Sequence, residues 1–123
     1  MVVISEYLRD IFAELDQSSE FLELSVSCED NTFSMATNGD CGDVTISIPD
    51  HSEIVHFFEC KKNSKAKYRM STLRMALKAI TMSEKLSIRM DKREFVCFQY
   101  LLNFPEGNCF LEYYCAPEET EDD

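Results

Sequence analysis

The sequence predicts the same order of elements twice, and this order restricts the fold more than any other feature. Residues 5–16 place apolar side chains on one face of a helix, with Ser5 as its expected N-cap; these side chains are Leu8, Ile11, Phe12 and Leu15. A second helix is predicted for Thr72–Met82, with Leu73-Arg74 lying 65 residues after Leu8-Arg9. The first three elements predicted after each helix are strands, so the order of one helix and then three strands occurs twice.

Short segments in which apolar and polar residues alternate predict the strands. They cover residues 21–28, 32–37, 44–48, 54–60, 67–71, 85–90, 95–102 and 109–115. Two helices and about eight mostly antiparallel strands make an α+β domain of two helix-plus-strands halves, with the helices on one face of the sheet. We expect a single domain over residues 1–117 and an acidic disordered tail over residues 118–123.

The net charge of −11 conceals a strong segregation of charge along the chain. Residues 61–93 hold eleven of the twelve Lys and Arg residues and two of the 23 acidic ones, so this segment carries +9 and the remainder −20. An acidic protein is repelled by a polyanion such as DNA, but a segment of +9 can form a surface that attracts phosphate.

Several classes of protein are disfavoured by composition. No apolar run approaches the length of a membrane span, and the N-terminus does not resemble a signal peptide. Three glycines in 123 residues leave no phosphate-binding loop. Six cysteines without a C-x-x-C pair, even with His51 and His56, do not predict a metal site. We therefore expect a soluble intracellular protein whose cysteines are reduced and act as small hydrophobic residues.

Three stretches together resemble a known family. They are LRDIFAELD at residues 8–16, KLSIRMD at residues 85–91 and CFLEYYCAPEE at residues 109–119. In this order they resemble one domain of the DNA sliding clamps, the ring-shaped proteins typified by proliferating cell nuclear antigen. Within these the chain is most similar to the C-terminal domain of the Rad-one-type subunit of the heterotrimeric checkpoint clamp (nine-one-one). A complete clamp subunit has two such domains, of which this chain contains one.

The resemblance implies a nuclear, non-catalytic protein that encircles duplex DNA without sequence specificity and acts in checkpoint signalling and DNA repair. The implied partners are two other clamp subunits, an ATP-dependent clamp loader, and repair and checkpoint proteins. No cofactor and no metal are expected. In such rings the helices line the hole, and the sheets form the outer wall.

The resemblance also assigns roles to individual residues. Arg74 and Lys78 are expected to face DNA from the second helix, the alternative being a solvated helix face. The segment Val44, Thr45, Ile46, Ser47 and Ile48 is expected to pair with a neighbouring subunit, the alternative being a strand inside the sheet.

A groove for partner peptides is expected at Tyr114, Ala116 and Pro117. The alternative is that Tyr114 only covers the core and that Pro117 only ends the last strand.

Three other functions stay open. A replicative processivity clamp would share the ring architecture. A 3'-5' DNA exonuclease, an activity attributed to the checkpoint family, would need clustered carboxylates for Mg²⁺, and the candidates Glu29, Asp30, Asp40 and Asp43 fall in predicted turns. The third is an acidic interaction domain that never contacts DNA.

Overall fold

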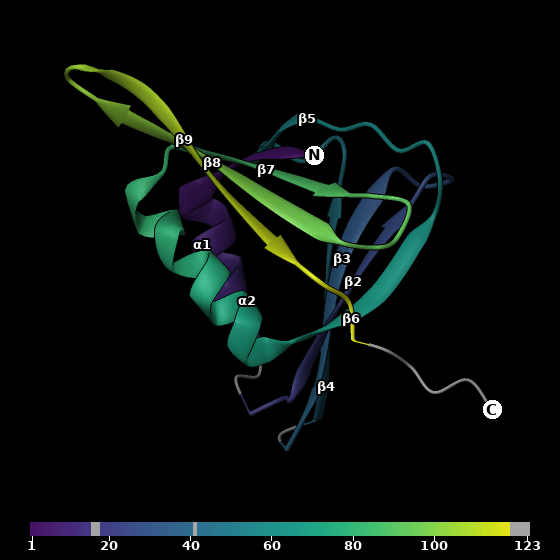
Figure 1. Ribbon diagram of the computed structural model, residues 1–123. Coiled ribbons are helices and arrows are strands. Elements are labelled where there is room, and N and C mark those ends of the chain that lie inside the picture. The colour runs from purple at the N-terminus through teal and green to yellow at the C-terminus, as the bar shows by residue number, and fades with distance from the viewer. Residues whose placement is uncertain (16–17, 41, 119–123) are drawn as a thin grey trace.

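The computed structural model describes residues 1–15, 18–40 and 42–118, and its elements confirm the α+β class (Figure 1). The helices are α1 (Ser5–Ala13), α2 (Met70–Leu77) and the 3-10 helix η1 (Lys78–Met82). The strands are β1 (Val2–Ile4), β2 (Phe21–Ser27), β3 (Thr32–Gly39), β4 (Gly42–Pro49), β5 (Val55–Phe57), β6 (Ser64–Arg69), β7 (Lys85–Met90), β8 (Val96–Phe104) and β9 (Gly107–Cys115). No helix in these ranges is long and apolar enough to cross a bilayer.

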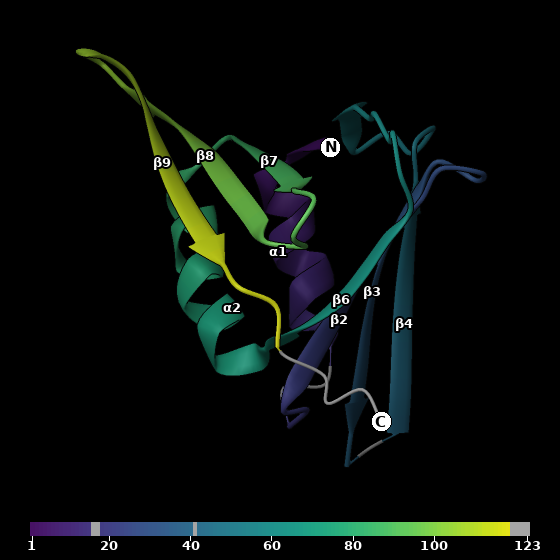
Figure 2. The ribbon, with the colours of Figure 1, turned by 45° about the vertical axis from the view of Figure 1, so that its right-hand side comes forward.

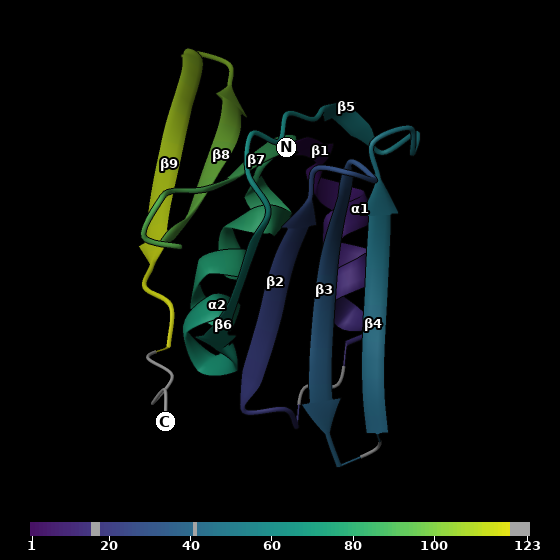
Figure 3. The same ribbon diagram turned by 90° about the vertical axis from the view of Figure 1, so that its right-hand side faces the viewer.

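The strands form two antiparallel sheets, and each half of the chain supplies a strand to the sheet of the other (Figures 2 and 3). The five-stranded sheet has the order β5-β1-β7-β8-β9, and the four-stranded sheet has the order β4-β3-β2-β6. Strand β1, which precedes α1, pairs with β7, and strand β6, which precedes α2, pairs with β2. Neither half can therefore complete its sheet without the other.

The limits of several elements differ from those predicted. Strand β1 was not predicted, because its three residues are too few to show an alternation. The second helix begins at Met70 and tightens to a 3-10 helix at Lys78. Ser5 is not the N-cap of α1: Ile4 holds that position, and Ser5 is buried, where its hydroxyl accepts a 2.7 Å hydrogen bond from Ser83.

One hydrophobic core joins the helices to both sheets. Helix α2 contacts β2 and β6 of one sheet and β9 of the other, and α1 contacts β1 and η1. The apolar stripe predicted for residues 5–16 is confirmed, since Leu8 of α1 and Leu15 beyond its end are buried and Ile11 and Phe12 pack against the core. The buried Leu73 and Ile80 confirm the apolar face predicted for the second helix. Burying each such side chain contributes about 1.5–3 kcal/mol.

The hydroxyl groups of two buried tyrosines connect different elements of the domain by hydrogen bonds. Tyr100 of β8 donates a hydrogen bond to the carbonyl of Ala76 in α2, and Tyr68 of β6 donates one to the carbonyl of Glu94. Burial is the main cause that raises the pKa of both phenols above the usual value for tyrosine. Both side chains are thus held in the neutral, hydrogen-bonded form.

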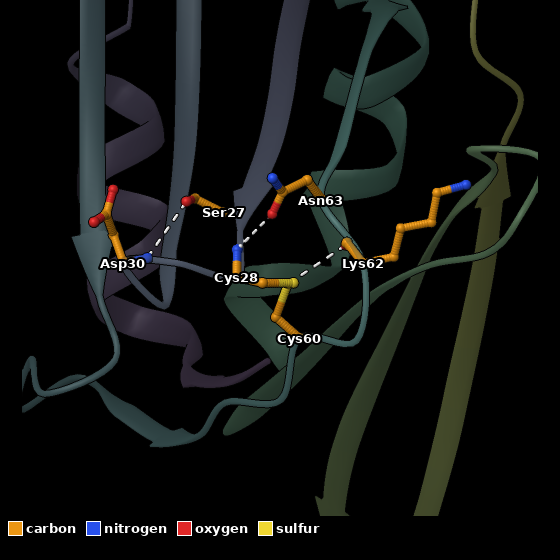
Figure 4. The surroundings of a disulfide bond; sticks show 6 residues. All are labelled: Ser27, Cys28, Asp30, Cys60, Lys62 and Asn63. Carbon is orange, nitrogen blue, oxygen red and sulfur yellow. Dashed lines mark hydrogen bonds between the residues drawn. A yellow bond between two sulfur atoms is a disulfide. The ribbon is translucent and has the colours of Figure 1, made fainter.

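The expectation that all the cysteines are reduced is wrong for one pair. Cys28 and Cys60, 32 residues apart, form a disulfide whose Cα atoms are 5.2 Å apart (Figure 4). They lie next to each other because Cys28 follows β2 and Cys60 precedes β6, the strand that pairs with β2. A pair of cysteines so far apart in the sequence forms no short motif from which the disulfide could have been predicted. In the chain-entropy view, closing a loop of this length stabilises the fold by about 3–4 kcal/mol.

We predict that stability falls in alkaline solution because of the buried phenols. Since the pKa of Tyr100 is higher in the folded than in the unfolded protein, its contribution is complete below pH 10 and is lost as the pH rises above that value. Urea denaturation at pH 8 and pH 11 should therefore show a smaller loss for Tyr100→Phe than for the unsubstituted chain. At pH 8 the variant should be less stable by about 1 kcal/mol, because the Ala76 carbonyl loses its donor.

The matched control is Tyr7→Phe, which removes an exposed hydroxyl from α1 and should leave the pH dependence unchanged. An equal alkaline loss in Tyr100→Phe and in the unsubstituted chain would contradict the role given to Tyr100.

Candidate nucleic-acid and subunit interfaces

The two residues predicted to face DNA lie on adjacent turns of one helical segment. Arg74 is exposed in α2, and Lys78 is exposed at the first position of η1. Lys78 keeps right-handed helical dihedrals, with φ −59° and ψ −32°, so the turn continues from α2 into η1. Residues four apart on such a helix are neighbours on its surface, and the two positive charges therefore lie close together.

Many of the other basic residues lie on the sheets or their loops, beside acidic partners. On β6, Lys65 lies 3.6 Å from Glu23, and Arg69 lies 3.5 Å from Glu20 and 3.0 Å from Glu118. Lys61 and Arg93 likewise contact Glu59 and Asp91. Three cations of the +9 segment, Lys61, Lys65 and Arg69, thus lie beside acids outside it, and the distant partners of Lys65 and Arg69 could not be seen from the order of residues alone.

Helix α1 presents acidic residues to solvent. Glu6, Asp10 and Glu14 are exposed, and Arg9 lies 3.4 Å from Asp10. Figure 1 shows α1 and α2 side by side, and α1 contacts η1 directly. The helical side of the domain therefore carries both signs of charge, with its positive part on α2 and η1.

The strand predicted to form a subunit interface lies at the edge of its sheet. Strand β4 pairs with β3 and is the first strand in the order of the four-stranded sheet. Ile48 is buried and Val44 and Ile46 pack against the core of this domain, whereas Thr45 and Ser47 are exposed. The apolar side chains thus serve the domain itself, and the part of β4 left open is its backbone edge.

The register identifies which backbone groups point outward. Just beyond the pair of Thr32 and Pro49, Asp50 donates its N–H to the carbonyl of Asn31, and hydrogen-bonded and open pairs alternate from there along β3 and β4. Val44 lies an even number of residues from Asp50 and therefore bonds to β3, whereas the N–H and C=O groups of Thr45 and Ser47 point to the open edge.

Strand β9 forms the edge of the other sheet, which the sequence reasoning missed. It pairs with β8, and its apolar residues Phe110 and Leu111 are 63% and 43% exposed. A signal was present in the sequence: two adjacent apolar residues place one apolar side chain on each face of a strand. In Figure 3, β9 and β4 lie at opposite sides of the domain.

The residues predicted to line a peptide groove lie on the surface at the end of β9. Tyr114 is 62% exposed, which argues against its only covering the core, and its hydroxyl donates a 2.8 Å hydrogen bond to Glu112. This hydrogen bond is the main cause that raises the pKa of Tyr114 to about 12. Tyr114 borders a cavity of about 340 Å³ whose other lining residues are Arg89, Met90, Asp91, Phe95 and Cys97.

The two other groove residues do not line this cavity. Ala116 is exposed and Pro117 is half-buried, and both follow β9, where the chain approaches β6. The next residue, Glu118, donates its N–H to the carbonyl of Lys67 over 2.7 Å. The structure thus places Ala116 and Pro117 beside β6 and Tyr114 in the cavity wall.

The carboxylates considered for metal-dependent catalysis are separated by the fold. Glu29 and Asp30 lie in the turn before β3, and Asp40 and Asp43 lie around the turn after it. The eight residues of β3 span roughly 25 Å, so the two pairs are too far apart to share a metal ion. Within the ranges that the structure describes, no three His, Cys, Asp or Glu residues converge on a metal position.

Comparison with known proteins gives the chain a family. Residues 1–102 match the family described as repair protein Rad1/Rec1/Rad17. Over 97% of its length the chain is 38% identical to the cell cycle checkpoint protein RAD1 of Mus musculus and 37% identical to that of Homo sapiens. It is 28% identical over 94% of its length to the DNA damage checkpoint control protein rad1 of Schizosaccharomyces pombe.

The chain spans less than half of these relatives, namely 43% of the mouse and human proteins and 36% of the fission yeast protein. The match nevertheless covers most of the chain and includes both helices and strands of both sheets. The chain belongs to the Rad1/Rec1/Rad17 family of checkpoint and DNA repair proteins.

Proposed function

We propose that this chain is a domain of a non-catalytic DNA clamp subunit, which joins two other subunits in a ring around duplex DNA at sites of damage. The observation that carries the proposal is that each sheet has an open terminal strand, β4 in one and β9 in the other, and that these two strands lie at opposite sides of the domain (Figure 3). A domain that can be extended by strand pairing on both sides is suited to a closed ring. Membership of a checkpoint and repair family supports the same role and a nuclear location.

The β4 edge is the proposed junction with a neighbouring subunit. Its outward backbone groups, at Thr45 and Ser47, can pair with a strand of that subunit in the manner of β-sheet augmentation. Because Val44, Ile46 and Ile48 pack on the domain's own core, main-chain hydrogen bonds contribute the main attraction at this edge. The side chains around them then select the partner.

Arg74 and Lys78 are the proposed contacts with DNA. Neighbouring charges on one helix can each meet a phosphate without reading bases, which lets a clamp slide. The acidic residues of α1 oppose this attraction, so the positive charge that faces the duplex depends on α2 and η1. A clamp that must move along DNA benefits from weak attraction rather than tight binding.

The cavity beside Tyr114 is the proposed site for peptides of repair and checkpoint partners. Its apolar residues Met90 and Phe95 can receive an apolar side chain, and Arg89 and Asp91 offer polar contacts at the same surface. Loading onto DNA is assigned to an ATP-driven loader, and the chemistry of repair to the partners, so the clamp domain needs no catalytic group.

For the subunit junction we predict that Thr45→Pro prevents ring assembly while the domain stays folded. The substitution removes an N–H that points to the open edge of β4 and keeps the hydrogen bonds between β3 and β4, since an edge strand tolerates proline on its outer side. Co-purification with the partner subunits should fall at least about tenfold, which corresponds to a loss of ~1.4 kcal/mol.

The control is Thr45→Val, which keeps the backbone N–H and should assemble normally. Circular dichroism should be the same for both variants. Normal co-purification of a folded Thr45→Pro variant would refute the assignment of β4 to the junction.

For the DNA contact we predict that Arg74→Gln with Lys78→Gln weakens the retention of the assembled clamp on duplex DNA. Each phosphate contact adds about 0.9 to the slope of log K against log salt concentration, so the slope should fall by about 2. Binding to a labelled duplex, measured at several salt concentrations, gives this slope directly.

Lys65→Gln with Lys67→Gln removes the same charge from β6 and serves as the matched control. The control pair should leave the slope nearly unchanged. Equal effects of the two double variants would mean that overall charge, and not the α2–η1 surface, governs binding to DNA.

A further inference from the structure

The disulfide between Cys28 and Cys60 closes the open end of the β2–β6 ladder. The last paired residues of these strands at this end are Val26 and Ser64, and the two cysteines lie just beyond them. The N–H of Cys28 donates a 2.7 Å hydrogen bond to the side chain of Asn63, and the sulfur of Cys60 lies 3.4 Å from the carbonyl oxygen of Lys62 (Figure 4). The turn of residues 61–63 is therefore held to the end of β2 by the disulfide at Cys60 and by the hydrogen bond at Asn63.

This pair lies where a small thiol can reach it. Both cysteines are half-buried, and Cys60 lines a cavity of about 530 Å³ between the ends of the two sheets. Four cationic side chains border the cavity, those of Lys61, Lys62, Arg89 and Lys92, together with the acidic Glu59 and Asp91. Cationic neighbours favour the thiolate form of a cysteine, which is the nucleophile in disulfide exchange. They also attract glutathione, which carries a net negative charge.

The other described cysteines do not offer such a pair. Cys97 and Cys115 are buried, and Cys109 is exposed on β9, in the other sheet. Proteins of reducing compartments rarely keep structural disulfides, and where they form one it is usually transient and redox-sensing. The nucleus proposed above as the location of this protein is a reducing compartment, so the role given to this bond rests on the proposed function.

We propose that Cys28 and Cys60 are a reversible redox pair that exchanges with glutathione disulfide, and that oxidation fastens the turn of residues 61–63 to the end of β2. The thiolate of Cys60 attacks a sulfur of glutathione disulfide, which forms a mixed disulfide and releases one glutathione thiolate. The thiolate of Cys28 then attacks the sulfur of Cys60 and releases the second. The two cysteines lose two electrons and two protons, and one glutathione disulfide becomes two glutathione molecules.

Oxidation restricts the motion of the turn of residues 61–63 and does not change the fold of the domain. In the reduced chain the turn keeps the hydrogen bond from Cys28 to Asn63 but loses its covalent link to β2. Lys61 and Lys62 belong to this turn and to the wall of the cavity. Reduction therefore loosens one wall of the cavity and moves two of its four cationic side chains.

The test equilibrates the chain in buffers of increasing glutathione disulfide content, blocks free thiols by alkylation and identifies each cysteine by mass spectrometry. The Cys28–Cys60 disulfide should form at the oxidising end and be lost completely, in the folded protein, under excess reduced glutathione. Backbone amides of residues 61–63 should exchange hydrogen at least about tenfold faster after reduction, whereas those of β8 should not change.

Two variants separate this pair from unspecific oxidation. In Cys28→Ser the mixed disulfide of Cys60 with glutathione should accumulate, because no second thiol resolves it, whereas Cys109→Ser should leave the exchange of the pair unchanged. Free thiols at both positions under fully oxidised glutathione would overturn the proposal. A disulfide that the folded protein never gives up would do the same, as would equal hydrogen exchange in the two states.

Discussion

The exchange of leading strands between the two halves is the constraint on which the rest of the structure depends. Strand β1 is bonded on both sides, to β5 and to β7, and β6 completes the sheet of β2, β3 and β4. Because strands of each half are part of the sheet of the other half, the two sheets share one core, and the helices pack on the same side of the domain. Leu73 of α2, for example, is fully buried where the helix contacts strands of both sheets.

The same exchange determines which strands stay open. With β6 bonded to β2, the strand at the opposite end of that sheet is β4, and with β1 between β5 and β7, the strand at the end opposite β5 is β9. The proposed junctions with other subunits are thus consequences of the strand order. The proposed DNA contacts at Arg74 and Lys78 follow as well, since α2 starts directly after β6 and is placed by it.

Much of this could be predicted from local patterns. The stripe of Leu8 and Leu15 and the alternation of Val44, Ile46 and Ile48 predicted the buried faces correctly, because the period of side chains along a helix or strand is a local property. The features that were missed depend on contacts between distant residues. Strand β1 exists because β5 and β7 pair with it, and Cys28 meets Cys60 because β2 lies beside β6.

The charge around the proposed DNA contact likewise could not be predicted from local patterns alone. The basic segment was visible in the sequence, but the acidic partners of Lys65 and Arg69 come from β2, its flanking turn and the end of the chain. Only the fold shows that α2 and η1, which carry Arg74 and Lys78, lie beside α1 with its acidic residues. Sequence alone therefore identified the helix proposed for DNA contact, but it did not reveal how much opposing charge lies beside it.

The most direct test of the proposed clamp is the cryo-electron microscopy structure of the complex that this chain forms with its partner subunits on duplex DNA. The account predicts a closed ring in which a neighbouring strand continues the sheet at the outer edge of β4 and in which α2 and η1 face the duplex. A complex in which the β4 edge stays open and α2 faces away from the DNA would contradict it.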